Sequence, residues 1–335
     1  MVGRVSAFAD AEVIRLATTE FVPATGDDWY QRRRRDAEGV FFKKITEQSP
    51  RRGSSTTTKQ GIYVFTADGE LLGFNNAGDN PAAVRGLLQT SLKKFRALPE
   101  ARRKPGGAIV EPLGKPDPQF ARWPPVGGAV VQVFTRILDR RDGTLTKGTC
   151  DFVGGDKAGR DFLWLTADDM AALMPPTALP PKPGAVSAWT AAVVRRLIRF
   201  HLVDNTRGEP EFWADEDIRS ARLRLTVTRV TDDVVEWNCG GEIRLATAAD
   251  PEQAERGFDA KLTGTLRWRR KEARFDAWKL TVLGEHWGAG TFTQNGVRPG
   301  RGLLGLTFQL IAEPTPAQTV PPQAARDLDD YFGRD

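Results

Sequence analysis

The stretch GFDAKLTGTLRWRRKEARFDAWKLTVLGEHW, residues 257–287, decides the fold of the larger part of this 335-residue chain. Large apolar residues alternate with polar ones in each half, and they are Phe258, Leu262 and Leu266, then Trp278, Leu280 and Val282. Successive side chains of a strand point to opposite faces, so a period of two is typical of a strand with one buried face. The stretch therefore predicts two neighbouring strands, 257–269 and 274–284.

Similar alternation on both sides of this stretch predicts an antiparallel sheet within residues 128–312. The further expected strands are 128–138, 221–230, 234–245 and 303–311. Because each strand has one apolar face, we expect a meander that curls into a barrel or half-barrel. Two helices are expected beside it. One begins with a capping box formed by Thr166 and Asp169, and the other ends near Leu202.

Residues 10–98 show a different pattern, in which helices and short strands alternate. The turn signal Ala67-Asp68-Gly69 predicts a hairpin, and Asn80 before Pro81 predicts the start of a helix. The expected elements are a helix after Asp10, a strand at 21–24, a helix at 29–47, strands at 61–66 and 71–75, and a helix at 81–97. The chain is therefore expected to be of the α+β class.

Two proline-rich stretches separate these parts. Residues 99–127 combine proline and glycine without periodicity, which is typical of a segment between domains. Residues 313–335 comprise a proline-rich linker and a short amphipathic helix around Leu328 and Tyr331. The sequence thus predicts a first domain over residues 1–98 and a β-rich domain over residues 128–312.

The composition excludes several classes of protein. With 40% hydrophobic and 27% charged residues, the chain falls in the globular range. It lacks an apolar run of the about 18 residues that a membrane span needs, and its cysteines are too few for a disulfide scaffold or a cysteine-rich zinc module. Because residues 1–20 lack the apolar core of a secretory signal, we expect a cytoplasmic protein with reduced thiols.

The chain is basic, with a formal net charge of +5 and a pI of about 9.3. Such a charge favours an anionic partner, but acidic residues accompany almost every basic cluster. Arg32 to Arg35 fall within the predicted helix 29–47, where four consecutive side chains sweep roughly 300° around the axis. They therefore form no single patch, and we do not expect nucleic acid to be the partner.

Residues 10–98 resemble a truncated thioredoxin-like module. The resemblance rests on the order of the elements and on the hairpin Gly61-Ile62-Tyr63-Val64-Phe65 with Asp68-Gly69-Glu70-Leu71-Leu72, which is similar to the last hairpin of thioredoxin-like proteins. The first strand and the catalytic turn of that fold are expected to be missing. The β-rich remainder resembles only a domain of unknown function.

The motifs on which thioredoxin chemistry depends are missing from this region. It contains no Cys-x-x-Cys, and Thr56 to Gln60 hold no proline where that fold places a cis-proline before its hairpin. A dithiol reaction needs a thiolate of lowered pKa and a second thiol that resolves the mixed disulfide. We therefore expect a redox-inactive module that is not a dithiol oxidoreductase.

Three places in the β-rich part carry candidate catalytic residues. Glu285 beside His286 offers a general base at a strand end, and His201 lies shortly before the carboxylate of Glu209. Cys150, in a glycine-rich turn, is a candidate nucleophile. Each of them also has a structural explanation, as a hydrogen-bonded histidine, a capped helix end or an ordinary turn. We predict neither a metal ion nor a cofactor.

The leading expectation is a non-catalytic accessory or scaffold protein that binds another protein through its sheet edges and its proline-rich tail. An alternative is a ligand-binding protein or hydrolase-like enzyme with a site around His286, Glu285 and His201. The nine tryptophans also suggest a small hydrophobic ligand as partner. A third class binds anions or nucleic acid through the arginine-rich surface, and predicts a strong salt dependence of the affinity.

Overall fold

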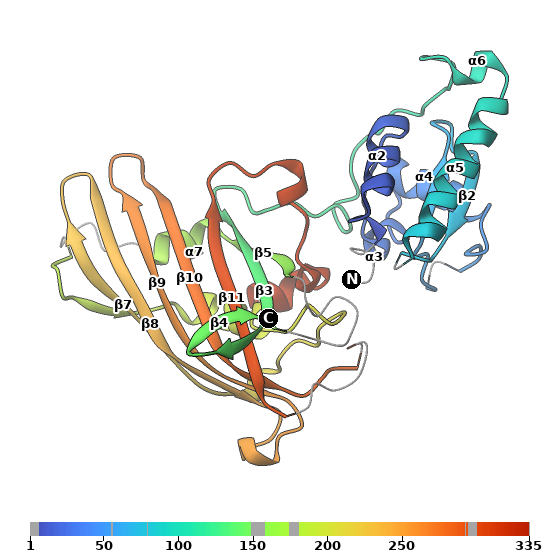
Figure 1. Ribbon diagram of the computed structural model, residues 1–335. Coiled ribbons are helices and arrows are strands. Elements are labelled where there is room, and N and C mark those ends of the chain that lie inside the picture. Colours follow the sequence, from blue (N-terminus) through green and yellow to red (C-terminus); the bar gives the residue numbers. More distant parts are fainter. Residues whose placement is uncertain are drawn as a thin grey trace. The chain divides into compact units, whose positions relative to one another are not determined.

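Figure 1 shows the computed structural model of the chain, which describes residues 7–54, 56–78, 80–148, 158–173, 181–291, 293 and 300–334. The chain divides into two compact units, and it passes from one to the other between Arg122 and Trp123. This boundary falls inside the proline- and glycine-rich segment that the sequence predicts between two domains.

Helices and a two-stranded antiparallel sheet make up the described part of the N-terminal unit. The elements are α2 (Ala11–Glu20), α3 (Asp28–Gln31), α4 (Ala37–Thr46), β1 (Ile62–Phe65), β2 (Leu71–Asn75), α5 (Pro81–Ala97) and α6 (Glu100–Arg103). The predicted caps are present, because Asp10 accepts from backbone N–H groups of α2 and Asn80 accepts from Ala83 N–H. Val13 of α2, Val64 of β1 and the inner side of α5 share one core.

The predicted helix 29–47 is wrong in one respect, because it is broken into α3 and α4. The Asp36 side chain accepts hydrogen bonds from Gly39 N–H and from the Arg34 guanidinium, and so begins a new helix. Such local side-chain bonds compete with continued helix. Arg32 to Arg35 therefore lie at the end of α3 and in the break, and not on one helix.

The predicted strand 21–24 is also wrong. These residues are irregular, and Val22 is 97% exposed, so its side chain is not buried against a sheet. The hairpin of β1 and β2 is therefore the whole sheet among the described residues of this unit. The resemblance to a thioredoxin-like module stays a prediction.

A large antiparallel sheet forms the C-terminal unit, as the alternating sequence predicts. Its strands are β3 (Ala129–Arg141), β4 (Thr144–Lys147), β5 (Gly159–Leu165), β6 (Val186–Ala188), β7 (Ile218–Val230), β8 (Val234–Ala246), β9 (Gly257–Arg269), β10 (Arg274–Trp287) and β11 (Gly302–Ile311). The order is β4-β3-β11-β10-β9-β8-β7-β6, and β5 also pairs with β3. Figure 1 shows β7 to β11 and β3 side by side as a curled sheet. Its described end strands do not pair with each other, so the sheet is open and not a closed barrel.

One face of this sheet packs on a helical layer. Helix α8 (Ala191–Arg196) continues into a π-helical turn, η1 (Leu197–His201), and Val193, Leu197 and Ile198 are fully buried in the core that they share with the sheet. The tryptophans of this core are Trp189, Trp213, Trp237, Trp268 and Trp278. Indole rings therefore fill the inner side of the sheet, where the sequence suggested room for a hydrophobic ligand.

The sequence did not predict strands β4, β5 and β6. Strands β4 and β6 are short and mostly exposed, whereas β5 is largely buried. All three residues of β6 are exposed, so it has no apolar face to detect. Strand β5 ends in the run Phe162–Leu165, which is buried throughout because Leu163 and Leu165 face the main core while Phe162 and Trp164 face a second cluster. A strand buried on both faces shows no alternation. The predicted capping box of Thr166 and Asp169 is confirmed at the start of α7 (Ala167–Ala172).

The close packing of β9 and β10 depends on a glycine that faces the core. A Cβ atom on Gly264 would lie 2.2 Å from the carbonyl oxygen of Lys279, whereas a Cβ atom on Gly240 of the adjacent strand would meet no atom closer than 3.9 Å. We predict that Gly264→Ala lowers the free energy of unfolding by about 2 kcal/mol, the usual cost of overpacking. Gly240→Ala is the matched control and should change it by less than about 0.5 kcal/mol. Urea denaturation followed by tryptophan fluorescence measures both, and equal effects would contradict this packing.

Candidate functional site

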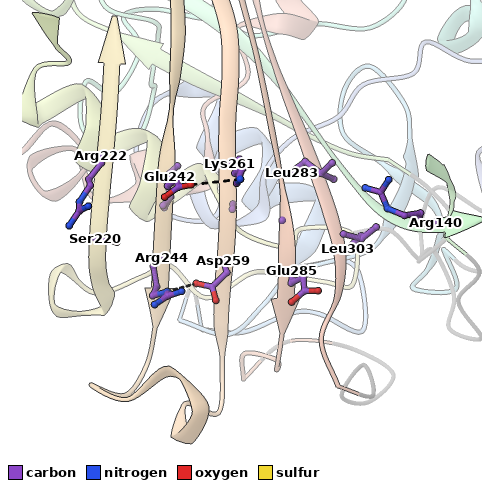
Figure 2. A pocket seen from close by; sticks show the side chains of 13 residues that line it. Arg140, Ser220, Arg222, Glu242, Arg244, Asp259, Lys261, Leu283, Glu285 and Leu303 are labelled. Carbon is purple, nitrogen blue, oxygen red and sulfur yellow. Dashed lines mark hydrogen bonds and ion pairs between the residues drawn. The ribbon is translucent and has the colours of Figure 1, made fainter. Parts of the chain in front are cut away.

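A charged hollow of about 590 Å³ lies on the outer face of the sheet, which is the face turned away from the helical core. Figure 2 shows that its side chains come from β7, β8, β9, β10, β11 and the end of β3. When one face of an antiparallel sheet is buried, the other carries the polar residues.

The first row of the hollow alternates in charge. The register sets Arg222 of β7 opposite Glu242 of β8, and Glu242 opposite Lys261 of β9. Glu242 and Lys261 form an ion pair of 3.7 Å, the upper dashed line in Figure 2. Within the described residues Arg222 makes no ion pair, and its side chain is exposed. Its guanidinium is therefore available for a carboxylate or phosphate from outside.

The second row sets two carboxylates side by side. Asp259 of β9 lies opposite both Arg244 of β8 and Glu285 of β10. Arg244 and Arg301 bind Asp259 at 2.8 and 3.2 Å, whereas Glu285 has no ion pair in the described ranges. Like charges at opposed positions of a sheet destabilise each other. Glu285 is therefore placed to attract a cationic group from a partner.

The sequence predicted a role for Glu285 but missed the rest of the hollow. Its charged residues occupy the polar positions of the alternating strands, which is the one signal that they carry in the sequence. Which of them become neighbours depends on the pairing of β7 with β8, β8 with β9 and β9 with β10. A list of polar positions does not contain that register.

Glu285 and His286, predicted to act together, point to opposite faces of β10. Glu285 lies at the hollow in Figure 2, whereas His286 is 3% exposed on the core side, where its ring centre is 5.9 Å from that of Phe258. Neighbouring residues of a strand face opposite ways. The pleat therefore contradicts a general base made of Glu285 and His286.

His286 instead belongs to a buried cluster with Asp204 and Arg207. Arg207 binds the Asp204 carboxylate at 2.5 Å, and it donates to the carbonyl oxygen of Gly288 at 2.9 Å. Burial alone would raise the pKa of the Asp204 carboxyl, but the charges of Arg207 and His286 hold that pKa below its ordinary value. The cluster joins the segment after η1 to the end of β10.

The carboxylates near His201 in sequence have structural partners of their own. The Glu211 carboxylate accepts from the Thr291 hydroxyl at 2.6 Å, which also ties the segment after η1 to the segment after β10. Glu209 binds Arg326 at 2.6 Å and accepts from Gln323. The structure thus brings the segment after η1 close to the segment after β10. The carboxylates of Glu209 and Glu211 form bonds within the chain.

His201 is buried in a hydrogen-bonded chain that ends in the C-terminal helix α9 (Leu328–Phe332). Its Nδ1 lies 2.9 Å from the Asp161 carboxylate and its Nε2 lies 2.9 Å from the Tyr331 hydroxyl, which also accepts from Trp164 N–H at 3.0 Å. The imidazole ring thus bridges the Asp161 carboxylate and the Tyr331 hydroxyl. Burial raises the pKa of the Tyr331 phenol, so it stays protonated. His201 has no access to a substrate.

Arginines of α8 and η1 hold the same C-terminal helix. Arg196 is 2% exposed, forms an ion pair with Asp169, and donates to the carbonyl oxygen of Tyr331 at 3.0 Å. Arg195 and Arg199 bind the Asp330 carboxylate at 2.8 and 2.7 Å. Arg195, Arg196 and Arg199 therefore hold α9 against α8 and η1.

The remaining candidates add no reactive centre to this picture. Cys150 lies outside the described residues, and burial raises the pKa of the Cys239 thiol to about 12. The described ranges contain no group of three or more His, Cys, Asp or Glu side chains that are placed to hold a metal ion. In the same ranges, no helix has both the length and the apolar character of a membrane span.

Comparisons with known proteins give no family for the chain. No protein-family model, curated protein or solved structure matches it.

We predict that Asp204 makes the folded state sensitive to acid. Its pKa is lower in the folded than in the unfolded chain, so it stabilises the fold above about pH 4 and loses this effect as the pH falls. Asp204→Asn should cost about 3 kcal/mol at pH 7, because it removes the carboxylate that faces the buried Arg207 guanidinium. It should also reduce the loss of stability between pH 5 and pH 3. Asp259→Asn, which weakens two partly exposed pairs with Arg244 and Arg301, is the control and should cost about 1 kcal/mol or less in urea denaturation.

We predict that the Tyr331 hydroxyl fastens the C-terminal helix. Tyr331→Phe leaves the Trp164 N–H and the His201 ring nitrogen without their partner, which costs about 1–3 kcal/mol. Carboxypeptidase should then remove the C-terminal residues faster than from the wild type. The same change at Tyr63, whose hydroxyl donates to Lys59 in the other unit, should leave this rate unchanged. Equal trimming of wild type and Tyr331→Phe would show that the hydroxyl does not hold the helix.

Proposed function

We propose that the chain is a non-catalytic binding protein, and that the charged hollow is its contact surface for another protein. The observation that carries the proposal is a set of exposed charges without an ion pair among the described residues on one sheet face, which are Arg222 of β7, Glu285 of β10 and Arg140 of β3. Arg222 and Glu285 lie beside ion pairs of the same face, so the hollow carries charges of both signs and not a uniform field.

Charge complementarity of this kind supports specific recognition. A partner surface that places an Asp or Glu at Arg222 and a Lys or Arg at Glu285 would match these two groups at once. Complementary charges steer encounter and fix the register of two surfaces, while a partner with the wrong pattern is repelled. Leu283 and Leu303 at the hollow add apolar area for such a partner.

The mixed charge of the hollow argues against nucleic acid as the partner, and the burial of the histidines argues against a hydrolase. A polyanion such as nucleic acid needs a surface of one sign, but Glu242, Asp259 and Glu285 stand among the cations of the hollow. A hydrolase needs a base that reaches its substrate, whereas His201 and His286 are buried and bonded on the core side. The N-terminal unit enters the proposal as a redox-inactive, thioredoxin-like part of a cytoplasmic scaffold.

We predict that charge reversal in the hollow weakens partner binding. The full chain is immobilised and exposed to a lysate of its own host, and retained polypeptides are quantified by mass spectrometry. Arg222→Glu and Glu285→Lys should each lower the affinity for a specific partner about tenfold, the effect of one lost charge pair. Lys279→Glu changes the charge as Arg222→Glu does, on the same face but outside the hollow, and should retain the partner.

The proposal is tested by how retention of a polypeptide differs among the variants, and not by its capture alone. A polypeptide that binds wild type and Lys279→Glu but neither hollow variant supports the proposal. If all four proteins retain the same polypeptides to the same extent, the hollow is not the contact surface.

A further inference from the structure

A groove of about 360 Å³ lies between strand β2 and helix α5 of the N-terminal unit. On the helix side it is lined by Ala83, Gly86, Thr90 and Lys94, which are spaced so as to share one face of α5. On the strand side Gly73 allows the helix to come close, because a Cβ atom there would lie 2.4 Å from the Ser91 hydroxyl. Gly86, in contrast, has open space where its Cβ atom would be. The groove is therefore bounded by a strand and a helix and open between them.

Strand β2 lies at an edge of its sheet, since among the described strands it pairs with β1 alone. Side chains occupy backbone groups of β2 that a further strand would use. The Lys94 ammonium donates to the Leu72 carbonyl at 2.7 Å, and Gln48 accepts from Leu71 N–H at 3.0 Å. Edge strands have backbone groups that can pair with another chain. Charged side chains at the edge, especially lysines, commonly limit such pairing.

Ser91 is a buried polar residue at the base of the groove. The residue is 0% exposed and lines the bottom of the groove under Gly73. Its hydroxyl has no hydrogen-bond partner in the described part of the chain. A buried polar group without a partner is costly and rare in native proteins. Gly73 covers this hydroxyl, so Ser91 reports on the contact of β2 with α5 and not on the incoming chain.

The charge of α5 identifies the chemistry of that incoming chain. The helix carries Arg85, Lys93, Lys94 and Arg96 and no Asp or Glu. Arg85 is paired with Asp10 and Arg96 with Glu20, which leaves the two exposed lysines at the groove end of the helix. Over residues 3–122, Lys and Arg outnumber Asp and Glu by 20 to 14. The surroundings of the groove therefore attract an acidic segment.

We propose that the groove between β2 and α5 binds an extended, acidic segment of another polypeptide, which adds to β2 as a third strand. The segment's backbone takes over the Leu72 carbonyl, and the Lys94 ammonium turns to one of its carboxylates. Backbone bonds to the edge supply affinity, and the groove selects the side chains, as in other cases of strand addition. This site lies on a different unit from the charged hollow, and no residue is shared between them.

The test uses the full chain and two synthetic hexapeptides, Ac-EVTVTE-amide as probe and Ac-KVTVTK-amide as its charge-reversed control. Fluorescence anisotropy measures affinity, and hydrogen exchange followed by mass spectrometry locates the contact. We expect the acidic peptide to bind, the basic one not to bind, and protection to rise at residues 71–75. Gly86→Trp fills the groove in a place where the structure has open space, and should weaken binding about tenfold.

Gln89→Trp is the matched control, since Gln89 is exposed on the same helix and does not line the groove. It should bind the acidic peptide as the wild type does. Lys94→Glu should weaken binding of the acidic peptide about tenfold without blocking the groove. The proposal is overturned if the acidic peptide does not bind, if Gly86→Trp binds it equally well, or if protection rises away from β2. Each of these results leaves the charged hollow of the other unit unaffected.

Discussion

The burial of one face of the large sheet against α8 and η1 is the constraint on which the rest of the structure depends. Each large apolar side chain buried there stabilises the fold by about 1.5–3 kcal/mol. An exposed ion pair on the other face contributes about 0–1 kcal/mol. The core therefore determines which way every strand faces, and the residues of the outer face contribute little to the stability of the fold. Its charges, among them Arg222 and Glu285, can be arranged for recognition.

The same constraint explains why the histidines are poor candidates for catalysis. His286 and His201 fall on the core side, where a polar group is tolerated only with partners. One is set beside Asp204 and Arg207, and the other links Asp161 to Tyr331. Buried pairs of this kind cost far more to break than they contribute. They fix the loops and the C-terminal helix on the sheet, and the chemistry of contact is left to the outer face.

The sequence predicts the long strands because one physical rule, alternate burial, sets both their pattern and their position. It fails at β5, which is buried on both faces, and at the break before Asp36, where one side-chain cap outweighs helix propensity. The sequence also suggested that Glu285 and His286 act together because they are adjacent in the chain. In a strand, adjacent side chains point to opposite faces. The rows of the hollow depend on register across separate strands, and no single segment of sequence contains that information.

Native mass spectrometry of the untagged chain from its own host, before and after acid denaturation, tests the central claim most directly. The account predicts that a second polypeptide adds its mass to the chain before denaturation and separates from it afterwards. A chain that instead carries a small molecule or a metal ion, with no polypeptide bound, would contradict a binding protein that acts through its outer sheet face.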